Sequence, residues 1–175
     1  LTDLFAGTYS LLVTDENGCT VSQDITVPFI SPSDWSVVET PFFHEIEIPS
    51  DASITIDFDA ITYGDYIAVG SGVEVNENGE MLSGFIGGMI MWNGSFDVLN
   101  AYNSVFNNGD VFEWMIWDAS TGMYYSADAV YDVDYPNTDS FEVGGLSHVT
   151  DIVARTVFAQ AIELPAGWGI YSTFI

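Results

Sequence analysis

Two groups of aspartates are the residues of this sequence whose types and spacing could perform chemistry. In each group two carboxylates stand two positions apart on a predicted strand, so that they face the same side, and a third follows in the next strand or loop. The groups are Asp57, Asp59 and Asp65, and Asp132, Asp134 and Asp139. Oxygen ligands suit Ca²⁺, which takes about six to eight hard ligands at flexible geometry. Ca²⁺ is therefore the one cofactor that the sequence suggests.

A solvent-exposed strand face is the competing interpretation of both groups. The calcium loop of the EF-hand, which begins Asp-x-Asx-x-Asx-Gly, matches nowhere in the chain. The stretch at residues 76–80 is closer to a hairpin loop. Because the chain has 26 acidic residues, carboxylate pairs also arise by chance.

The sequence does not predict an enzyme. Paired carboxylates occur in glycoside hydrolases, where two acids flank a sugar bond, but nothing here marks one carboxylate as buried with a raised pKa. His44 and His148 have no convincing Ser or Cys partner, and we expect both to be strand residues whose rings are satisfied by backbone groups. The single cysteine, Cys19, cannot form a disulfide within the chain, and a zinc site is not expected. We expect Cys19 to be a small buried apolar residue.

Tryptophans offer a second kind of site, a platform on which sugar rings could stack. In the predicted strand at residues 111–117, Phe112, Trp114 and Ile116 share the obvious core face. Trp117 points to the other face, so we expect it to be exposed or to pack beneath a loop or a neighbouring module. Trp92 and Trp117 are therefore the candidate ligand-binding residues.

The charge of the chain is extreme. Its 26 acidic residues face a single base, Arg155, and no Lys, so the formal net charge is −25. Such a surface repels nucleic acid and anionic membranes, and no apolar run approaches the length of a membrane span. Either a solvated, salt-adapted surface or bound divalent cations accommodate the charge. We expect neither nucleic acid nor membrane insertion, and we expect Arg155 to hold a carboxylate at a domain edge.

Short strands separated by turns must position these residues. Turn sequences rich in Gly, Asn, Asp and Pro recur about every ten residues, and no segment keeps a helical period. This spacing predicts an all-β fold, an antiparallel β-sandwich of Ig-like or jelly-roll-like type. The predicted central strands cover residues 35–39, 44–48, 54–58, 66–70, 85–92, 95–101, 111–117, 123–133, 140–143 and 148–153.

The first 27 residues predict a β-hairpin. Apolar residues alternate on both sides of Asn17 and Gly18, which can both take positive φ and are the expected tight turn. Leu-Phe-Ala-Gly-Thr-Tyr at 4–9 and Val-Thr-Asp-Glu-Asn-Gly-Cys-Thr at 13–20 resemble the repeat of SprB-type gliding-motility adhesins of the Bacteroidetes. The resemblance implies that residues 1–30 are the C-terminal half of an Ig-type repeat, whose first half would lie upstream.

The central part resembles a β-sandwich module of large secreted and surface proteins of the same phylum. The matching motifs are Gly-Asp-Tyr-Ile-Ala-Val at 64–69, a Gly-rich strand ending in Trp-Asn-Gly at 84–94, and Gly-Asp-Val-Phe-Glu-Trp-Met-Ile-Trp at 109–117. Pro28 and Pro32 mark a break before it, because each proline removes a backbone donor. The expected organisation is a linker at 31–34, the module at 35–155 and the first strand of a following module at 156–175.

The function that these resemblances imply is structural and adhesive. The chain would be a segment of a large extracellular, multi-domain bacterial surface protein, exported by type IX secretion and acting in gliding motility or attachment. Its partners would be neighbouring modules of the same polypeptide, surface glycans or the secretion machinery. Two alternatives stay open: a carbohydrate-binding module of a secreted enzyme, and a filament subunit that assembles by strand addition. Binding would be expected on the loops at residues 76–80 and 107–110.

Overall fold

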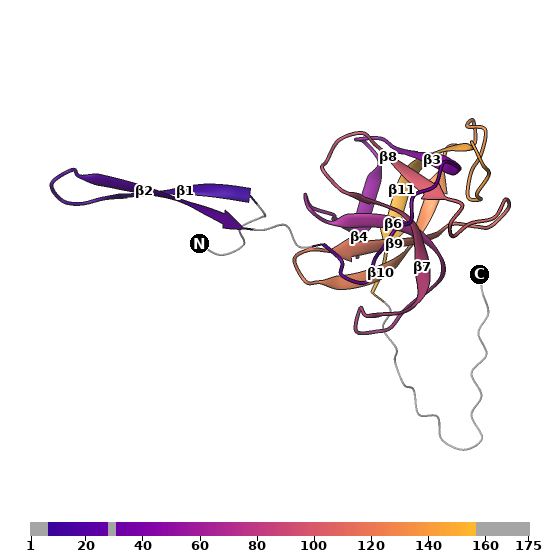
Figure 1. Ribbon diagram of the computed structural model, residues 1–175, viewed down its shortest axis with the longest axis horizontal. Helices are drawn as coiled ribbons and strands as arrows, with labels where there is room; N and C mark the ends of the chain where they lie inside the picture. The colour runs from indigo at the N-terminus through magenta and orange to yellow at the C-terminus, as the bar shows by residue number, and fades with distance from the viewer. Residues whose placement is uncertain (1–6, 28–30, 157–175) are drawn as a thin grey trace, which may run out of the picture.

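The computed structural model describes residues 7–27 and 31–156, and every regular element in them is a β-strand (Figure 1). The predicted all-β fold is therefore confirmed. Because these residues form no helix, none of them belongs to a helix long and apolar enough to cross a membrane. The strand predicted at 156–175 lies, apart from Thr156, outside the described residues, as does the part of the adhesin-like motif before Gly7.

The strands form two separate sheets. Strands β1 (Gly7–Thr14) and β2 (Thr20–Val27) pair with each other as an antiparallel hairpin. The other nine strands belong to one sheet system. Their bounds are β3 Phe43–Ile48, β4 Ser53–Ile56, β5 Asp59–Ala60, β6 Tyr66–Val75, β7 Met81–Met91, β8 Asp97–Tyr102, β9 Glu113–Asp118, β10 Met123–Tyr131 and β11 Leu146–Ala154.

The larger sheet divides where β11 changes partners. Its main path is β5-β4-β11-β10-β9-β6-β7, and β3 joins β11 to β8 on a second branch. The first residues of β11 pair in parallel with β3, and its last residues pair in parallel with β4. All other pairs are antiparallel. The predicted antiparallel sandwich thus contains two parallel pairs, because residues 43–56 run beside β11 in its own direction.

Strands β7 and β8 lie against each other without forming a ladder, and so bring the two branches together. Gly88 of β7 permits this approach, since a Cβ there would collide with the backbone carbonyl of Asn100 on β8. Gly87 leaves room in the same way for the ring of Phe106. The sheet therefore curls around a common core.

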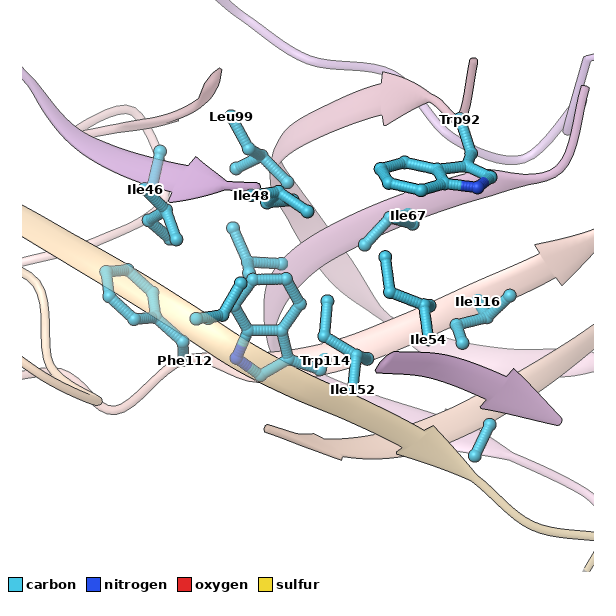
Figure 2. Packing of buried hydrophobic residues seen from close by; sticks show 14 of the residues in the cluster. Ile46, Ile48, Ile54, Ile67, Trp92, Leu99, Phe112, Trp114, Ile116 and Ile152 are labelled. Atoms are coloured by element: carbon cyan, nitrogen blue, oxygen red, sulfur yellow. The ribbon is translucent and has the colours of Figure 1, made fainter. Parts of the chain in front are cut away.

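The core between the two branches is apolar. Ile46 and Leu99 from β3 and β8 meet Ile67, Trp114 and Ile116 from β6 and β9 (Figure 2). All five are at most 4 % exposed. Complete burial of one such aliphatic side chain stabilises the fold by roughly 1.5–3 kcal/mol. The inward positions alternate along each strand, as the period of two in the sequence predicts.

A second apolar layer covers the outer face of the same strands. Met115 and Trp117 of β9 lie in it with Tyr124 of β10. The irregular segment before β3 supplies Trp35, whose ring centroid lies 5.6 Å from that of Tyr124. Strand β9 is therefore buried on both faces, which explains why apolar residues follow one another in it without alternation.

Most predicted strands occur within a few residues of their predicted bounds, but two do not. Residues 35–39 are irregular, and residues 140–143 contribute only the isolated bridge between Ser140 and Val111. The alternation at 35–39 comes from Trp35 and Val37, which pack onto the outer layer without joining a ladder. Alternating burial therefore produces the pattern of a strand where no strand forms.

The first hairpin turn differs from the expected one. Residues 15–19 form a five-residue loop, in which the Asp15 carboxylate accepts two backbone N–H groups at 2.9 and 2.8 Å. Gly18 has a φ of 82°, whereas Asn17 is not left-handed, so the predicted two-residue turn is wrong. The side chain of Asn76 closes a second loop of related sequence in the same way, at residues 76–80, which confirms a hairpin loop there.

Candidate functional site

The tryptophans that could form a sugar-stacking platform are buried. Trp92 and Trp117 are 8 % and 4 % exposed, so neither indole offers a face to a sugar ring. Of the two outcomes expected for Trp117, packing beneath a loop is the one that occurs, because the irregular segment carrying Trp35 covers that face of the sheet. The ring of Trp117 also meets the ring of Tyr66 edge-on, at 5.8 Å between centroids. Trp114 lies in the core, as its position along the strand predicts.

Asp65 is a buried carboxylate held by the backbone. It is 2 % exposed and accepts hydrogen bonds from the backbone N–H groups of Thr62 at 2.6 Å and of Ala119 at 2.9 Å. The hydroxyl of Thr62 donates to it at 3.1 Å. Asp65 thus ties the turn before β6 to the loop after β9, and donors already occupy both of its oxygens.

An acidic hollow of about 230 Å³ brings three of the predicted calcium ligands to one place. Asp57, Asp59 and Asp65 line it together with Asp118, which the sequence did not single out. The four carboxylates do not converge on one point. In the described part of the chain, no three His, Cys, Asp or Glu side chains are grouped so that they could hold a metal ion.

Hydrogen bonds favour the ionised form of two carboxylates in this hollow. The hydroxyl and the backbone N–H of Thr156 donate to Asp57, the N–H at 2.8 Å, and lower its pKa. Burial raises the pKa of Asp118, but hydrogen bonds from Ser120 and Thr121 outweigh burial and the net shift is downward. A carboxyl with a lowered pKa is a poor general acid at neutral pH. Asp57 and Asp118 are therefore poor candidates for the acid with a raised pKa that glycoside hydrolysis requires.

The turn between β4 and β5 is strained, and Arg155, the single Arg or Lys of the chain, lies beside it. Asp57 and Phe58 have φ values of 48° and 75°, and a left-handed Phe is uncommon. Phe58 is 82 % exposed, and the guanidinium of Arg155 lies 5.7 Å from its ring centroid. Within the described residues Arg155 makes no ion pair, but its charge contributes to the lowered pKa of Asp57. The hydrogen bonds to Asp57 come from Thr156.

The second predicted group of calcium ligands does not assemble. Asp132 accepts a hydrogen bond from the backbone N–H of Asp134 at 3.0 Å and so closes a local turn. Asp139 lies on another segment, where its carbonyl accepts the N–H of Phe112 at 2.8 Å. The spacing along the sequence therefore did not predict proximity for these three carboxylates.

His44 is fully buried and joins three segments of the chain. Its Nδ1 accepts the backbone N–H of Glu142 at 3.1 Å, which leaves Nε2 to donate to the hydroxyl of Ser147 at 2.8 Å. That hydroxyl donates in turn to the carbonyl of Thr138 at 2.6 Å. Burial lowers the pKa of His44, so its imidazole is neutral. The ring is a structural connector, and it packs edge-on against Phe112.

Glu47, Tyr135 and His148 form the cluster that comes nearest to a catalytic arrangement. The Glu47 carboxylate accepts the hydroxyl of Tyr135 at 2.9 Å and meets Nδ1 of His148 at 3.1 Å. The rings of Tyr135 and His148 stack at 4.5 Å. A carboxylate orients an imidazole in this way in acid–base dyads. The adjacent Ser147 cannot serve as nucleophile, because it points to the other side of β11 and is engaged with His44.

A slot opens where β9 and β10 separate. Their pairing ends at Trp114 opposite Ala127, whereas β10 continues to Tyr131 beside β11 alone. The residues before β9 turn away and form the bridge of Val111 to Ser140. The slot has a volume of about 430 Å³. The sequence did not predict this slot, because the point at which two paired strands separate has no signature in the local sequence.

The two loops expected to bind a partner close on themselves. In the loop at 107–110, the Asp110 carboxylate accepts the backbone N–H of Asn107 at 2.7 Å. The loop at 76–80 is held by Asn76, whose side chain reaches Glu80 at 2.7 Å. Cys19, expected to be buried, is exposed at the end of the first hairpin turn.

Comparison of the chain with models of protein families, with curated proteins and with solved structures found no significant match.

Proposed function

We propose that this chain is a structural and adhesive segment of a large extracellular, multi-domain bacterial surface protein. The observation that carries the proposal is the β1–β2 hairpin, which leaves an apolar face open beside a module with an enclosed core. The strand motifs support it, since they resemble adhesin repeats and secreted modules of the Bacteroidetes. That resemblance adds type IX secretion, and gliding motility or attachment, to the proposal.

One face of the hairpin is apolar. The antiparallel register places Tyr9 opposite Ile25 and Val13 opposite Val21, with Leu11 between them on the same face. Leu11, Val13, Val21 and Ile25 are 44 %, 53 %, 66 % and 47 % exposed. An isolated two-stranded hairpin is at best marginally stable in water. This face therefore needs another sheet against it.

The size of the face indicates which kind of sheet. Eight residues at about 3.4 Å each give a length of about 27 Å, and two strands that each occupy about 5 Å give a width of about 10 Å, so the face measures roughly 270 Å². A stable interface between separate proteins buries about 800 Å² on each side. The hairpin face is too small for that, but covalent linkage raises the effective concentration of a partner sheet. We infer that the hairpin belongs to a β unit completed by other strands of the same polypeptide.

The charge suits a chain of modules that stays extended. With a net charge of −25 and no Lys, neighbouring modules repel each other and resist aggregation. Such modules act as spacers that hold a binding surface away from the cell. The same row of linked modules serves attachment, because it carries that binding surface.

Labelling of intact cells tests the extracellular assignment. An antibody raised against this chain should stain intact cells that produce the protein, and brief protease treatment of those cells should remove the signal. Staining that requires permeabilised cells would overturn the assignment.

Deletion tests the adhesive part of the proposal. Cells whose protein lacks residues 31–156, with export unchanged in the antibody assay, should attach to surfaces less than the parent cells. Unchanged attachment at equal surface display would overturn the adhesive role.

A further inference from the structure

The edge of β10 beside the slot has no partner strand. Residues 128–131 pair with β11 on one side, and no described strand pairs with them on the other. Four residues of free edge extend over about 14 Å and present backbone N–H and C=O groups that a ladder normally uses. Such an edge accepts an extended peptide by strand addition.

Other edges of the sheet are less available. Strand β5 has only two residues, and β8 and part of β7 lie against each other. The edge of β10 also borders a hollow of about 430 Å³, a volume within the range of ligand pockets. A bound segment could therefore bury side chains there as well as pair its backbone.

Carboxylates surround the slot. Glu113, Asp128 and Asp139 line it, and all three are exposed. Tyr131 also lines it and is half-buried, and its hydroxyl accepts the indole N–H of the buried Trp114 at 2.7 Å. Exposed carboxylates suit a cationic side chain by ion pairing.

We propose that the slot binds an extended, basic segment of another protein, which adds a strand to β10 and places Lys or Arg side chains among Glu113, Asp128 and Asp139. The partner cannot be a second copy of this chain, because the chain has one Arg and no Lys and carries a charge of −25. The inference does not depend on the proposed surface location, and either can fail without the other.

A short synthetic peptide that alternates Lys with Thr or Val is the probe. Calorimetric titration at about 0.15 M salt should show binding to the full chain, and a peptide with Gln in place of Lys should bind far more weakly. A Lys peptide methylated at its backbone nitrogens should also bind weakly, because it cannot form the ladder. Hydrogen exchange should slow at residues 128–131 when the Lys peptide binds.

Paired variants separate the slot from bulk charge. Glu113→Gln with Asp128→Asn should weaken binding about tenfold, since two exposed ion pairs are lost. Gln keeps the carbonyl that accepts the N–H of Val73, so the fold is retained. Glu16→Gln with Asp24→Asn removes the same charge from the hairpin and should leave binding unchanged.

Three results would overturn the proposal. They are equal losses in the two paired variants, tight binding of the methylated peptide, and binding of the Lys peptide without protection at 128–131. Self-association of the chain through this edge would assign the slot to a second copy and would also overturn it.

Discussion

His44 shows what a single polar residue does inside this module. Both of its ring nitrogens are engaged, one with the backbone N–H of Glu142 and the other with Ser147. A second proton on Nδ1 would face that N–H and break the connection to the loop before β11. The neutral form is therefore a condition of the native packing, and the pKa of His44 is lowered by burial.

The lowered pKa predicts a loss of stability in mild acid. Below the pKa of about 6.5 that a histidine has in the unfolded chain, the unfolded chain binds a proton at His44 and the folded chain does not. The free energy of unfolding therefore decreases as the pH is lowered. The fall has a limit of about 1.4 kcal/mol per pH unit and ends once pH drops below the folded pKa. Denaturant unfolding between pH 8 and pH 5 measures it. His44→Gln should reduce this slope, whereas a slope equal to that of the parent chain would contradict the assignment.

Trp35 is the residue whose role the sequence least revealed. Its alternation with Val37 predicts a strand, yet it works as a cover for the outer face of β9, with no hydrogen-bond partner for its buried indole N–H among the described residues. The position of Trp117 along its strand determines the face of the sheet on which its side chain lies. Whether that face is exposed to solvent depends on Trp35, some eighty positions away. The local sequence pattern therefore predicts the face and does not predict the burial.

Two substitutions at Trp35 should distinguish the contribution of its apolar ring to the free energy of unfolding from that of its indole N–H group. Trp35→Phe keeps most of the apolar area and removes an unpaired buried donor, so we expect a loss below about 1.5 kcal/mol in the free energy of unfolding. Trp35→Ala opens a cavity above Trp117 and should cost about 3–5 kcal/mol. Chemical denaturation measures both. Equal losses in the two variants would show that the indole N–H has a partner.

Among the elements, the β1–β2 hairpin is the one that leaves an apolar face exposed. Its existence could be predicted from the alternation on both sides of Asn17 and Gly18, but its five-residue loop could not, because the Asp15 carboxylate organises that loop. The parallel pairing of β11 with β3 and β4 could not be predicted either, because it joins residues about a hundred positions apart and depends on the whole arrangement. The same holds for the place of Asp118 in the acidic hollow, because this last residue of β9 is about fifty to sixty positions from Asp57, Asp59 and Asp65, which the sequence did group.

Hydrogen exchange should show that the hairpin is completed elsewhere. In this chain we expect the amides of β1 and β2 to exchange orders of magnitude faster than those of β9 and β11, because the apolar side chains Leu11, Val13, Val21 and Ile25 of the hairpin are exposed. In the parent polypeptide the hairpin amides should become protected. Strong protection of β1 and β2 in this chain would contradict the incomplete unit.

At the scale of the whole molecule, repulsion among carboxylates is the dominant electrostatic effect. A net charge of −25 opposes the compact state, and salt screens it over a Debye length of about 8–10 Å. We therefore expect the melting temperature to rise with NaCl. Because the described carboxylates form no metal-binding group, Ca²⁺ and Mg²⁺ at matched ionic strength should raise it equally. A larger effect of Ca²⁺, reversed by chelator, would support the calcium prediction.

The two parallel pairs of β11 have a mechanical consequence. The strands that begin and end the module run side by side, so tension applied at its two ends draws β3 and β4 one way and β11 the other. The hydrogen bonds of both pairs are then sheared together and resist as a group. Single-molecule stretching through residues 34 and 156 should therefore need a higher force than stretching through residues 43 and 145, which peels the same strands apart bond by bond. Equal forces would contradict this. Strands that share load in this way stay folded up to a higher force than strands whose hydrogen bonds break one at a time.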